Sequence, residues 1–295
     1  MKKLANFVKK YSALIITFVI LITVILGYYA LQINIEAGIK DMLPEENEVV
    51  KKYDRISDTF GGGMAYAVVM LEDEEIIDSP TLNKIDKMSS ELKEIKGVDD
   101  VKSLTTIEKI EGSFTGIEVN NFVKKIPETK AEAKKIKEDL LSHDQYLGKI
   151  VTKDFKSTVL LADIADRDNP EKVVNKIQQA ITKYEGPEEI HTTGSPVMVA
   201  DATDYMKQDL KKLLPFVIAA ILIILYISFR SIRGVLLPIS TVLISVIWAL
   251  GLQSILGKSL SLVSTVLPVL LVSVGSAYAI HVVARYYEEL KDGEN

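Results

Sequence analysis

The sequence predicts an α-helical membrane protein with four transmembrane helices and an extracytoplasmic α+β domain. Crossing a hydrocarbon core takes roughly 20 apolar residues of helix, and the chain has four apolar runs of about that length. These runs cover residues 13–31, 213–229, 235–256 and 260–284. Soluble globular proteins rarely carry four such runs. Residues 34–212, by contrast, are rich in Lys, Glu and Asp, as in a water-soluble domain.

The composition argues against several classes of function. Cysteine is absent, which leaves no disulfide framework, no Cys-based zinc site and no thiol chemistry. The net charge of −5, without a basic patch, argues against a nucleic-acid partner. The glycine triplet at 61–63 lacks the Lys-Ser/Thr pair of a phosphate loop, and we interpret it as a helix stop. No nucleophile–base pair or metal-ligand cluster stands out, so the sequence predicts no enzyme, cofactor or metal.

Basic residues beside the apolar runs predict the orientation. The first run follows four lysines, at positions 2, 3, 9 and 10, which keep the N-terminus in the cytoplasm. That run is long, and no convincing small-x-small cleavage site follows it, so we interpret it as an uncleaved helix rather than a signal peptide. Arg230, Arg233 and Arg285 follow the second and fourth runs, in agreement with this topology.

Three segments result from this topology. Residues 1–33 form the cytoplasmic N-terminus and the first transmembrane helix. Residues 34–212 form the extracytoplasmic domain. Residues 213–295 form transmembrane helices two to four and a cytoplasmic tail. We also expect residues 196–212 to be helical and to run into the second span, which would couple the domain mechanically to the membrane.

The extracytoplasmic segment contains an approximate repeat of a strand–helix–strand unit. In the first copy, strands at 65–73 and 98–104 flank a helix that Ser79-Pro80 opens. In the second copy, strands at 156–164 and 188–194 flank a helix that Asn169-Pro170 opens. A capping residue followed by Pro is a typical start of a helix, and Gly is a typical end. The repeat predicts two small ferredoxin-like subdomains, with further helices at 47–60 and 129–142.

The fourth apolar run carries small residues at helical spacing. Ser273 and Ala277 are four residues apart, as are Gly275 and Ala279. Small residues at this spacing let another transmembrane helix approach closely. The sequence therefore predicts a helix that packs inside a membrane bundle, with these four residues as its packing face.

The fourth run also holds the candidates for ion coupling. The first three spans contain no Asp, Glu, Lys, Arg or His between their ends, whereas the fourth contains His281 near Tyr278. Tyr278, His281 and Arg285 lie on one helical face, and a His can relay protons near neutral pH. Ser276, Tyr278 and His281 are therefore ion-coupling candidates, because titratable groups inside a membrane indicate function. In the alternative interpretation, the Tyr and His lie near the interface and are satisfied by neighbours or lipid headgroups.

The helix that enters the second span carries a polar face. Asp201, Asp204 and Tyr205 lie on it, together with Gln208. They are candidates for a substrate entrance at the outer membrane surface. The alternative is an ordinary solvated face.

Five stretches, taken in order, resemble one half of an RND-superfamily exporter of the MMPL-like hydrophobe/amphiphile efflux type. They are T-G-S-P at 193–196, K-K-L-L-P-F at 211–216, F-R-S-I-R-G-V-L-L-P at 229–238, V-I-W-A-L-G at 246–251 and G-S-A-Y-A-I-H-V-V-A-R-Y-Y-E-E at 275–289. The resemblance covers the whole chain. It implies export of hydrophobic or amphiphilic molecules, often lipids, across the cell membrane, driven by an ion gradient. It also implies porter-type external subdomains and contact with membrane lipid.

The chain departs from the family pattern at two points. Many members place a proton-carrying Asp immediately before the Tyr of the fourth span, and this position is Ala277 here. His281 or a second half of the transporter would then have to supply the titratable group. Members usually carry six spans in each of two halves, so the resemblance implies an N-terminal half truncated after the fourth span. Its partner would be the missing second half or another copy of the chain.

Two other functions stay open on the sequence alone. One is a membrane-anchored binding or sensor module, similar to sterol-sensing proteins. The lack of a carboxylate at Ala277 favours this alternative. The other is a protein-translocation accessory, which shares the half-repeat topology but has weaker motif support.

Overall fold

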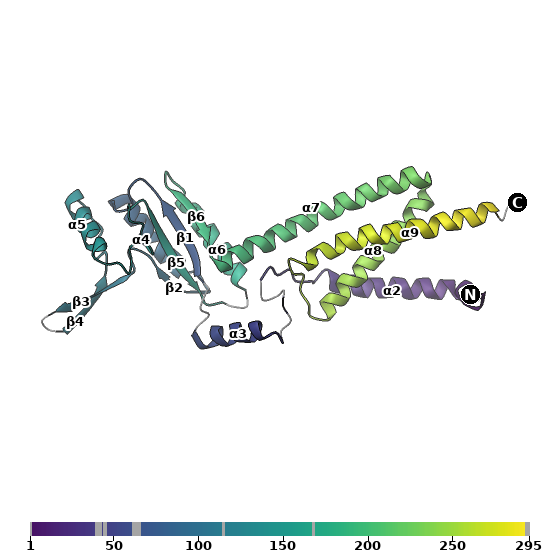
Figure 1. Ribbon diagram of the computed structural model, residues 1–295, viewed down its shortest axis with the longest axis horizontal. Coiled ribbons are helices and arrows are strands. Elements are labelled where there is room, and N and C mark those ends of the chain that lie inside the picture. The colour runs from purple at the N-terminus through teal and green to yellow at the C-terminus, as the bar shows by residue number, and fades with distance from the viewer. Residues whose placement is uncertain are drawn as a thin grey trace. The chain divides into compact units, whose positions relative to one another are not determined.

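The computed structural model describes residues 2–38, 43, 46–60, 66–113, 116–166 and 169–292. The glycine triplet at 61–63 lies outside the described residues. The chain divides into two compact units (Figure 1). One consists of Glu45–Asp201 and is called the α/β unit; the other consists of Met1–Pro44 and Ala202–Asn295 and is called the membrane-helix unit.

The described residues include four helices that are long and apolar enough to cross a membrane. They are α2 (Ser12–Ala30), α7 (Ser195–Phe229), α8 (Ile232–Ile255) and α9 (Leu267–Asp292). A short helix, α1 (Lys2–Lys10), precedes α2, and a 3-10 turn, η3 (Ser264–Val266), precedes α9. The predictions of four apolar spans and of a membrane protein with an α+β region are confirmed. The helix expected at 196–212 is also confirmed, because α7 continues through it without a break.

The core of the membrane-helix unit is small. Val242 and Val246 of α8 and Val272 of α9 are buried together, and partly buried residues of α7 pack against them. Most other apolar side chains of these helices are exposed, and α2 buries none of its residues. This is the arrangement expected where lipid tails, rather than protein, contact the outer faces of the helices.

The α/β unit contains a four-stranded antiparallel sheet. Its strands are β1 (Tyr66–Glu72), β2 (Val98–Lys102), β5 (Ser157–Ile164) and β6 (Glu189–Thr193), in the order β2-β5-β1-β6. Buried and less buried residues alternate along β1 and β5, so one face of the sheet holds the core. On the buried face, Val69 of β1 lies opposite Leu160 of β5.

Two helices complete this core. They are α4 (Ser79–Lys93) and α6 (Pro170–Ile181). Asp78 caps α4, because its carboxylate accepts a hydrogen bond from the backbone N–H of Thr81 at 2.9 Å. Each helix buries the apolar stripe that the sequence places on one side, namely Leu82, Ile85, Met88 and Leu92 of α4 and Val173, Val174, Ile177 and Ile181 of α6.

The two strand–helix–strand units do not form one subdomain each. They contribute two strands each to a single sheet, in which β1 of the first unit pairs with β5 and β6 of the second. The prediction of two ferredoxin-like subdomains is therefore not confirmed. The physical reason is that neither unit alone has enough strands to cover its helix, whereas four strands together bury both helices on one face.

Residues between β2 and β5 form an addition to the sheet that the sequence analysis missed in part. It contains a hairpin of β3 (Glu108–Ser113) and β4 (Gly116–Asn121), followed by α5 (Lys130–Leu141). Helix α5 begins with the capping box expected from Thr129 and Glu132. The strands of the hairpin were not predicted.

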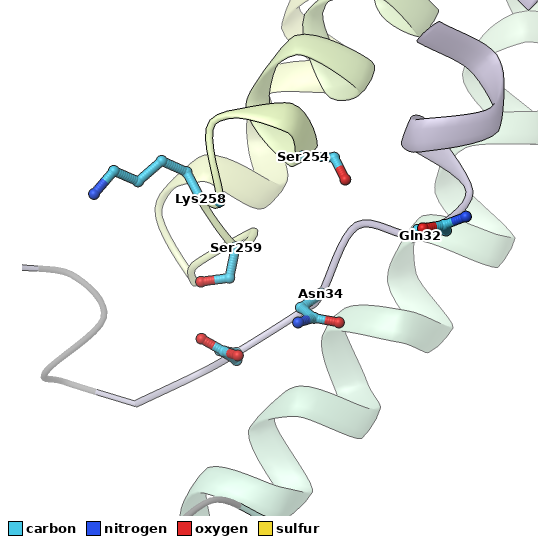
Figure 2. A pocket seen from close by; sticks show the side chains of 7 residues that line it. Gln32, Asn34, Ser254, Lys258 and Ser259 are labelled. Atoms are coloured by element: carbon cyan, nitrogen blue, oxygen red, sulfur yellow. The ribbon is translucent and has the colours of Figure 1, made fainter. Parts of the chain in front are cut away.

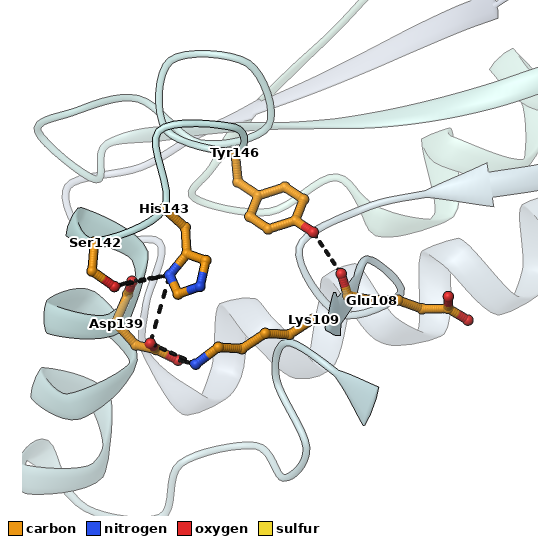
Figure 3. Close-up of polar contacts among 6 residues, drawn as sticks. All are labelled: Glu108, Lys109, Asp139, Ser142, His143 and Tyr146. Carbon is orange, nitrogen blue, oxygen red and sulfur yellow. Dashed lines mark hydrogen bonds and ion pairs between the residues drawn. The ribbon is translucent and has the colours of Figure 1, made fainter. Parts of the chain in front are cut away.

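Polar contacts hold the hairpin to α5 and to the chain that follows (Figure 3). Lys109 Nζ lies 2.7 Å from both carboxylate oxygens of Asp139, and the Tyr146 hydroxyl donates to the Glu108 carbonyl at 2.5 Å. His143 Nδ1 lies 2.8 Å from the Asp139 carbonyl oxygen. The ion pair between Lys109 and Asp139 therefore connects β3 to the end of α5.

A second polar cluster connects α4 to η2 (Thr182–Tyr184), the 3-10 turn that follows α6. Glu91 of α4 accepts hydrogen bonds from Lys183 at 2.5 Å and from the Tyr184 hydroxyl at 2.7 Å. The hydrogen bonds from Lys183 and Tyr184 lower the pKa of Glu91. Burial and the hydrogen bond to Glu91 raise the pKa of Tyr184 to about 12.

Candidate functional site

Helix α9 packs on α8 at Gly275, one of the small residues that the sequence analysis selected. A Cβ added to Gly275 would lie 3.2 Å from Val242 Cγ2, so a larger residue there would press against α8. Ser276 is only 7% exposed, and its hydroxyl donates to the Ser273 carbonyl at 2.8 Å. Gly275 and Ala279 are half-buried. The Ser276 hydroxyl is thus satisfied within its own helix, while Gly275 lies against α8.

The other predicted residues of α9 stay uncovered. Ser273, Ala277 and His281 are exposed, and Tyr278 is 71% exposed. Among the described residues, neither Tyr278 nor His281 has a hydrogen-bond partner in the bundle. The structure therefore separates the candidates, because Ser276 is inside the bundle while Tyr278 and His281 face outward.

The outward face of α9 ends in a charged cluster. Arg285, on the same face as Tyr278 and His281, lies 3.1 Å from Glu288 and 2.5 Å from Glu289. These contacts run along the helix at spacings of three and four residues. Arg285 is thus paired within its own helix, with Glu288 and Glu289.

Helix α2 packs on α8 through residues that the sequence analysis did not select. A Cβ on Gly251 would collide with the backbone carbonyl of Leu26, so only glycine permits this approach. One turn away, the Trp248 indole N–H donates to the Thr23 hydroxyl at 2.9 Å. The signal was present in V-I-W-A-L-G, which holds the single Trp of the chain three residues before a glycine.

The turn between α7 and α8 is tied to α9. Arg230 has φ of 46°, and Ser231 caps α8 by accepting from the Gly234 N–H at 3.1 Å. The hydroxyl groups of Ser231 and Tyr287 lie 3.3 Å apart. The ring of Tyr287 also lies 6.3 Å from that of Phe229. This end of the bundle therefore has defined contacts between three helices.

At the other end of the bundle, the chain leaving α2 pairs with the loop between α8 and α9. Leu260 donates from its N–H to the Asn34 carbonyl at 2.7 Å, and the Glu36 N–H donates to the Leu260 carbonyl at 3.0 Å. The Ala37 N–H then donates to the Thr203 hydroxyl of α7 at 3.2 Å. The loops of this end are thus joined by backbone hydrogen bonds.

A small polar pocket of about 120 Å³ lies beside this pairing (Figure 2). Its lining comes from the end of α2, the chain after it and the loop after α8, namely Gln32, Asn34, Glu36, Ser254, Gly257, Lys258 and Ser259. The pocket is too small for a large amphiphile, since sites for drug-sized ligands are ~300–1,000 Å³.

The predicted entrance residues lie on α7 and are exposed. The Asp201 carboxylate accepts from the Gln178 side-chain amide at 3.2 Å. Asp204 lies 3.6 Å from Lys207, and the side chain of Tyr205 is 67% exposed. The structure places the three on one face of α7, and their role as an entrance stays a prediction.

These features define a class, which is a helical membrane protein whose described residues form four apolar helices, with an α/β unit between the first two. The chain is matched over residues 41–295 by the model of the MMPL family and therefore belongs to that family. MMPL proteins are transporters of the RND superfamily, so the family suggested by the sequence motifs is confirmed.

One relative has been found in an archaeon. It is a protein of Methanocaldococcus jannaschii that is 26% identical over 310 residues, and its name goes no further than a membrane protein. The match covers 99% of this chain and 76% of the relative. Similarity thus extends through both units.

Proposed function

We propose that this chain is a transporter of the RND/MMPL type that exports hydrophobic or amphiphilic molecules, lipids among them, driven by an ion gradient. The observation that supports this most directly is the family match over residues 41–295, which includes the α/β unit and three of the four apolar helices. We place the chain in the cell membrane, with its N-terminus in the cytoplasm and the α/β unit outside.

In this proposal the α/β unit is a porter-type subdomain. Its strands and helices follow the order β1-α4-β2-β5-α6-β6 in one sheet, which is the β-α-β-β-α-β order of ferredoxin-like folds. Helix α7 starts two residues after β6 and continues to Phe229. Movement of the sheet during transport would pass along this helix.

Ion coupling is assigned to Tyr278, His281 and Ser276. Ala277 cannot bind a proton, so His281 is the titratable group that α9 itself offers inside its apolar run. The exposed Ser273 and Ala277 leave room for a further helix to approach Tyr278 and His281 closely. We propose that this helix comes from a second transporter half or from another copy of the chain, and that it supplies the missing carboxylate.

Asp201, Asp204 and Tyr205 are proposed to receive the amphiphile at the membrane surface. Their exposure supports this role, and two carboxylates would favour a substrate with a cationic group. Replacing both Asp residues by Asn should then reduce transport of cationic amphiphiles more than that of anionic ones. An unchanged substrate range would remove these residues from the proposal.

A second candidate is a binding or sensor module that moves no substrate. The observation that favours it is Ala277, because α9 has no carboxylate at the position where many members of the family carry the proton. Binding of an amphiphile without flux would identify this alternative.

Transport by the full chain in lipid vesicles separates the two candidates. A fluorescent lysophospholipid should cross the bilayer when a pH gradient is imposed and stop when the gradient is collapsed. His281→Ala and Tyr278→Phe should each slow this flux, whereas the control Tyr226→Phe should not, since Tyr226 is also exposed but lies on α7. Flux that ignores the gradient, or full flux with His281→Ala, would contradict the assigned coupling.

A further inference from the structure

Helix α3 (Glu48–Phe60) carries an apolar stripe that is more than half exposed, whereas Val50, on another side of the helix, is buried. Val49, Tyr53 and Ile56 lie four and three residues apart, on one face of the helix. Their side chains are 63%, 51% and 56% exposed. No described helix or strand packs extensively against α3. An exposed stripe of this kind on a helix indicates a binding surface.

Helix α3 as a whole carries no net charge. Its three basic residues, Lys51, Lys52 and Arg55, are offset in the sequence by three acidic residues, namely Glu48, Asp54 and Asp58. Lys52 lies beside the stripe and 3.3 Å from Glu48, so its stem can extend along apolar surface while its amine stays in water. A strongly amphipathic helix with Lys and Arg on the polar face is typical of a helix that lies in a membrane interface.

The chain that precedes α3 is fixed at one end of the membrane helices. The Ala37 N–H donates a hydrogen bond to the Thr203 hydroxyl, and the Glu36 N–H donates one to the Leu260 carbonyl. Ten residues, 38–47, then lead to the start of α3. Even fully extended, ten residues span at most about 36 Å. The linker thus begins at the ends of the membrane helices, and its length allows α3 to reach the bilayer surface.

We propose that the stripe of α3 binds the bilayer surface into which the protein's own helices insert. Val49, Tyr53 and Ile56 enter the boundary between headgroups and acyl chains, and the charged face stays in water. A helix of this kind places its apolar side ~5–10 Å into that boundary. Because α3 has no net charge, the binding depends on apolar burial and is insensitive to the charge of the lipid. The proposal does not depend on the chain being a transporter.

The absence of cysteine allows a direct test with single labels in the full chain. Ile56→Cys and Lys51→Cys each carry a bimane fluorophore, in vesicles of phosphatidylcholine with some phosphatidylglycerol. Brominated lipids should quench the label at position 56 about threefold more than the label at position 51, and aqueous iodide should show the reverse order. Leu236→Cys, at an exposed position of α8, confirms that the protein is inserted, because brominated lipids must quench it.

Three outcomes would contradict the proposal. Iodide quenching at position 56 equal to that at position 51 would mean that the stripe faces water. Protection of position 56 from both quenchers would mean that protein covers it, either a second copy or another part of this chain. Equal quenching in vesicles with and without phosphatidylglycerol is expected, and a strong dependence on the anionic lipid would contradict the role of apolar burial.

Discussion

Helix α4 of the α/β unit and helix α2 of the membrane-helix unit differ in how far their apolar side chains are buried. The stripe of α4 is fully buried, whereas α2 buries none of its 19 residues although nearly all of them are apolar. The two units are adapted to different solvents. In water, apolar area stabilises a fold only when it is covered, while in a bilayer the lipid tails cover it. An apolar side chain is therefore favourable inside the α/β unit, where protein covers it, and on the outside of the membrane-helix unit, where lipid covers it.

The largest effect that follows from this comparison concerns Leu160, which is fully buried in β5. Leu160→Ala leaves a cavity and should lower the free energy of unfolding of the α/β unit by about 2–5 kcal/mol. Leu236→Ala, on the exposed face of α8, should change stability by less than ~0.5 kcal/mol. Hydrogen exchange of the β1 amides reports the first change. Similar losses from both substitutions would show that the contrast between the units is wrong.

Gly251 tests the membrane-helix unit where its helices touch. Gly251→Ala places a methyl group against the Leu26 backbone and should cost about 1–3 kcal/mol, because the two helices must move apart. Gly27→Ala is the control, since its Cβ would lie at an ordinary 3.6 Å from Ile247 Cγ2. Thermal unfolding followed by Trp248 fluorescence measures both. Equal stability of the two variants would contradict close packing at Gly251.

A smaller effect is expected for the hydrogen bond between Trp248 and Thr23. Thr23→Val removes the acceptor and should cost about 0.6 kcal/mol, a typical value for one such bond between membrane helices. The emission of Trp248 should shift as the indole N–H loses its partner. Thr17→Val is the matched control, because the Thr17 hydroxyl bonds only the Ala13 carbonyl of its own helix. A shift of the same size in both variants would argue against the contact.

The smallest effect concerns the cluster on the surface of the α/β unit. Glu91→Gln removes the acceptor charge and should lower the pKa of Tyr184 from about 12 towards 10.0. Because the folded pKa is raised, the contribution of Tyr184 to stability is complete below pH 10.0 and is lost as the pH rises towards 12. For Glu91, whose folded pKa is lowered, the contribution is present above 4.5 and is lost as the pH falls.

Absorbance of tyrosinate, measured as the difference between the wild type and Tyr184→Phe, gives the pKa of this one residue. The comparison is repeated in the Glu91→Gln background. An unchanged pKa would show that Glu91 does not interact with Tyr184 in solution. The effect on stability should be small, since solvent screens ion pairs between exposed side chains.

Local patterns predicted most of the elements but not their association. The apolar spacing of α4 and α6 and their caps identified the helices because those signals lie within a few residues of each other. The pairing of Val69 with Leu160 joins strands far apart in the chain, and no local pattern encodes it. The two repeats were therefore interpreted as separate subdomains.

The site was predicted to a similar degree. The small residues of α9 indicated close packing with another helix. The pairs Ser273/Ala277 and Gly275/Ala279 have the same spacing, so the sequence could not tell which of them lies towards α8. Gly251 and Trp248 were visible as part of a family motif. Their contacts depend on how α2 and α8 meet, which the pattern of a single helix does not contain.

The bond between Thr23 and Trp248 joins residues 225 positions apart, which has a consequence for synthesis of the chain. At roughly 5–20 residues per second, α2 emerges about 11–45 s before its partner on α8. The α/β unit is translated entirely within this interval. An apolar helix can wait alone in the bilayer because it satisfies its own backbone hydrogen bonds. The sheet therefore has time to fold before α8 is synthesised, and the bundle assembles around α2, which is already inserted.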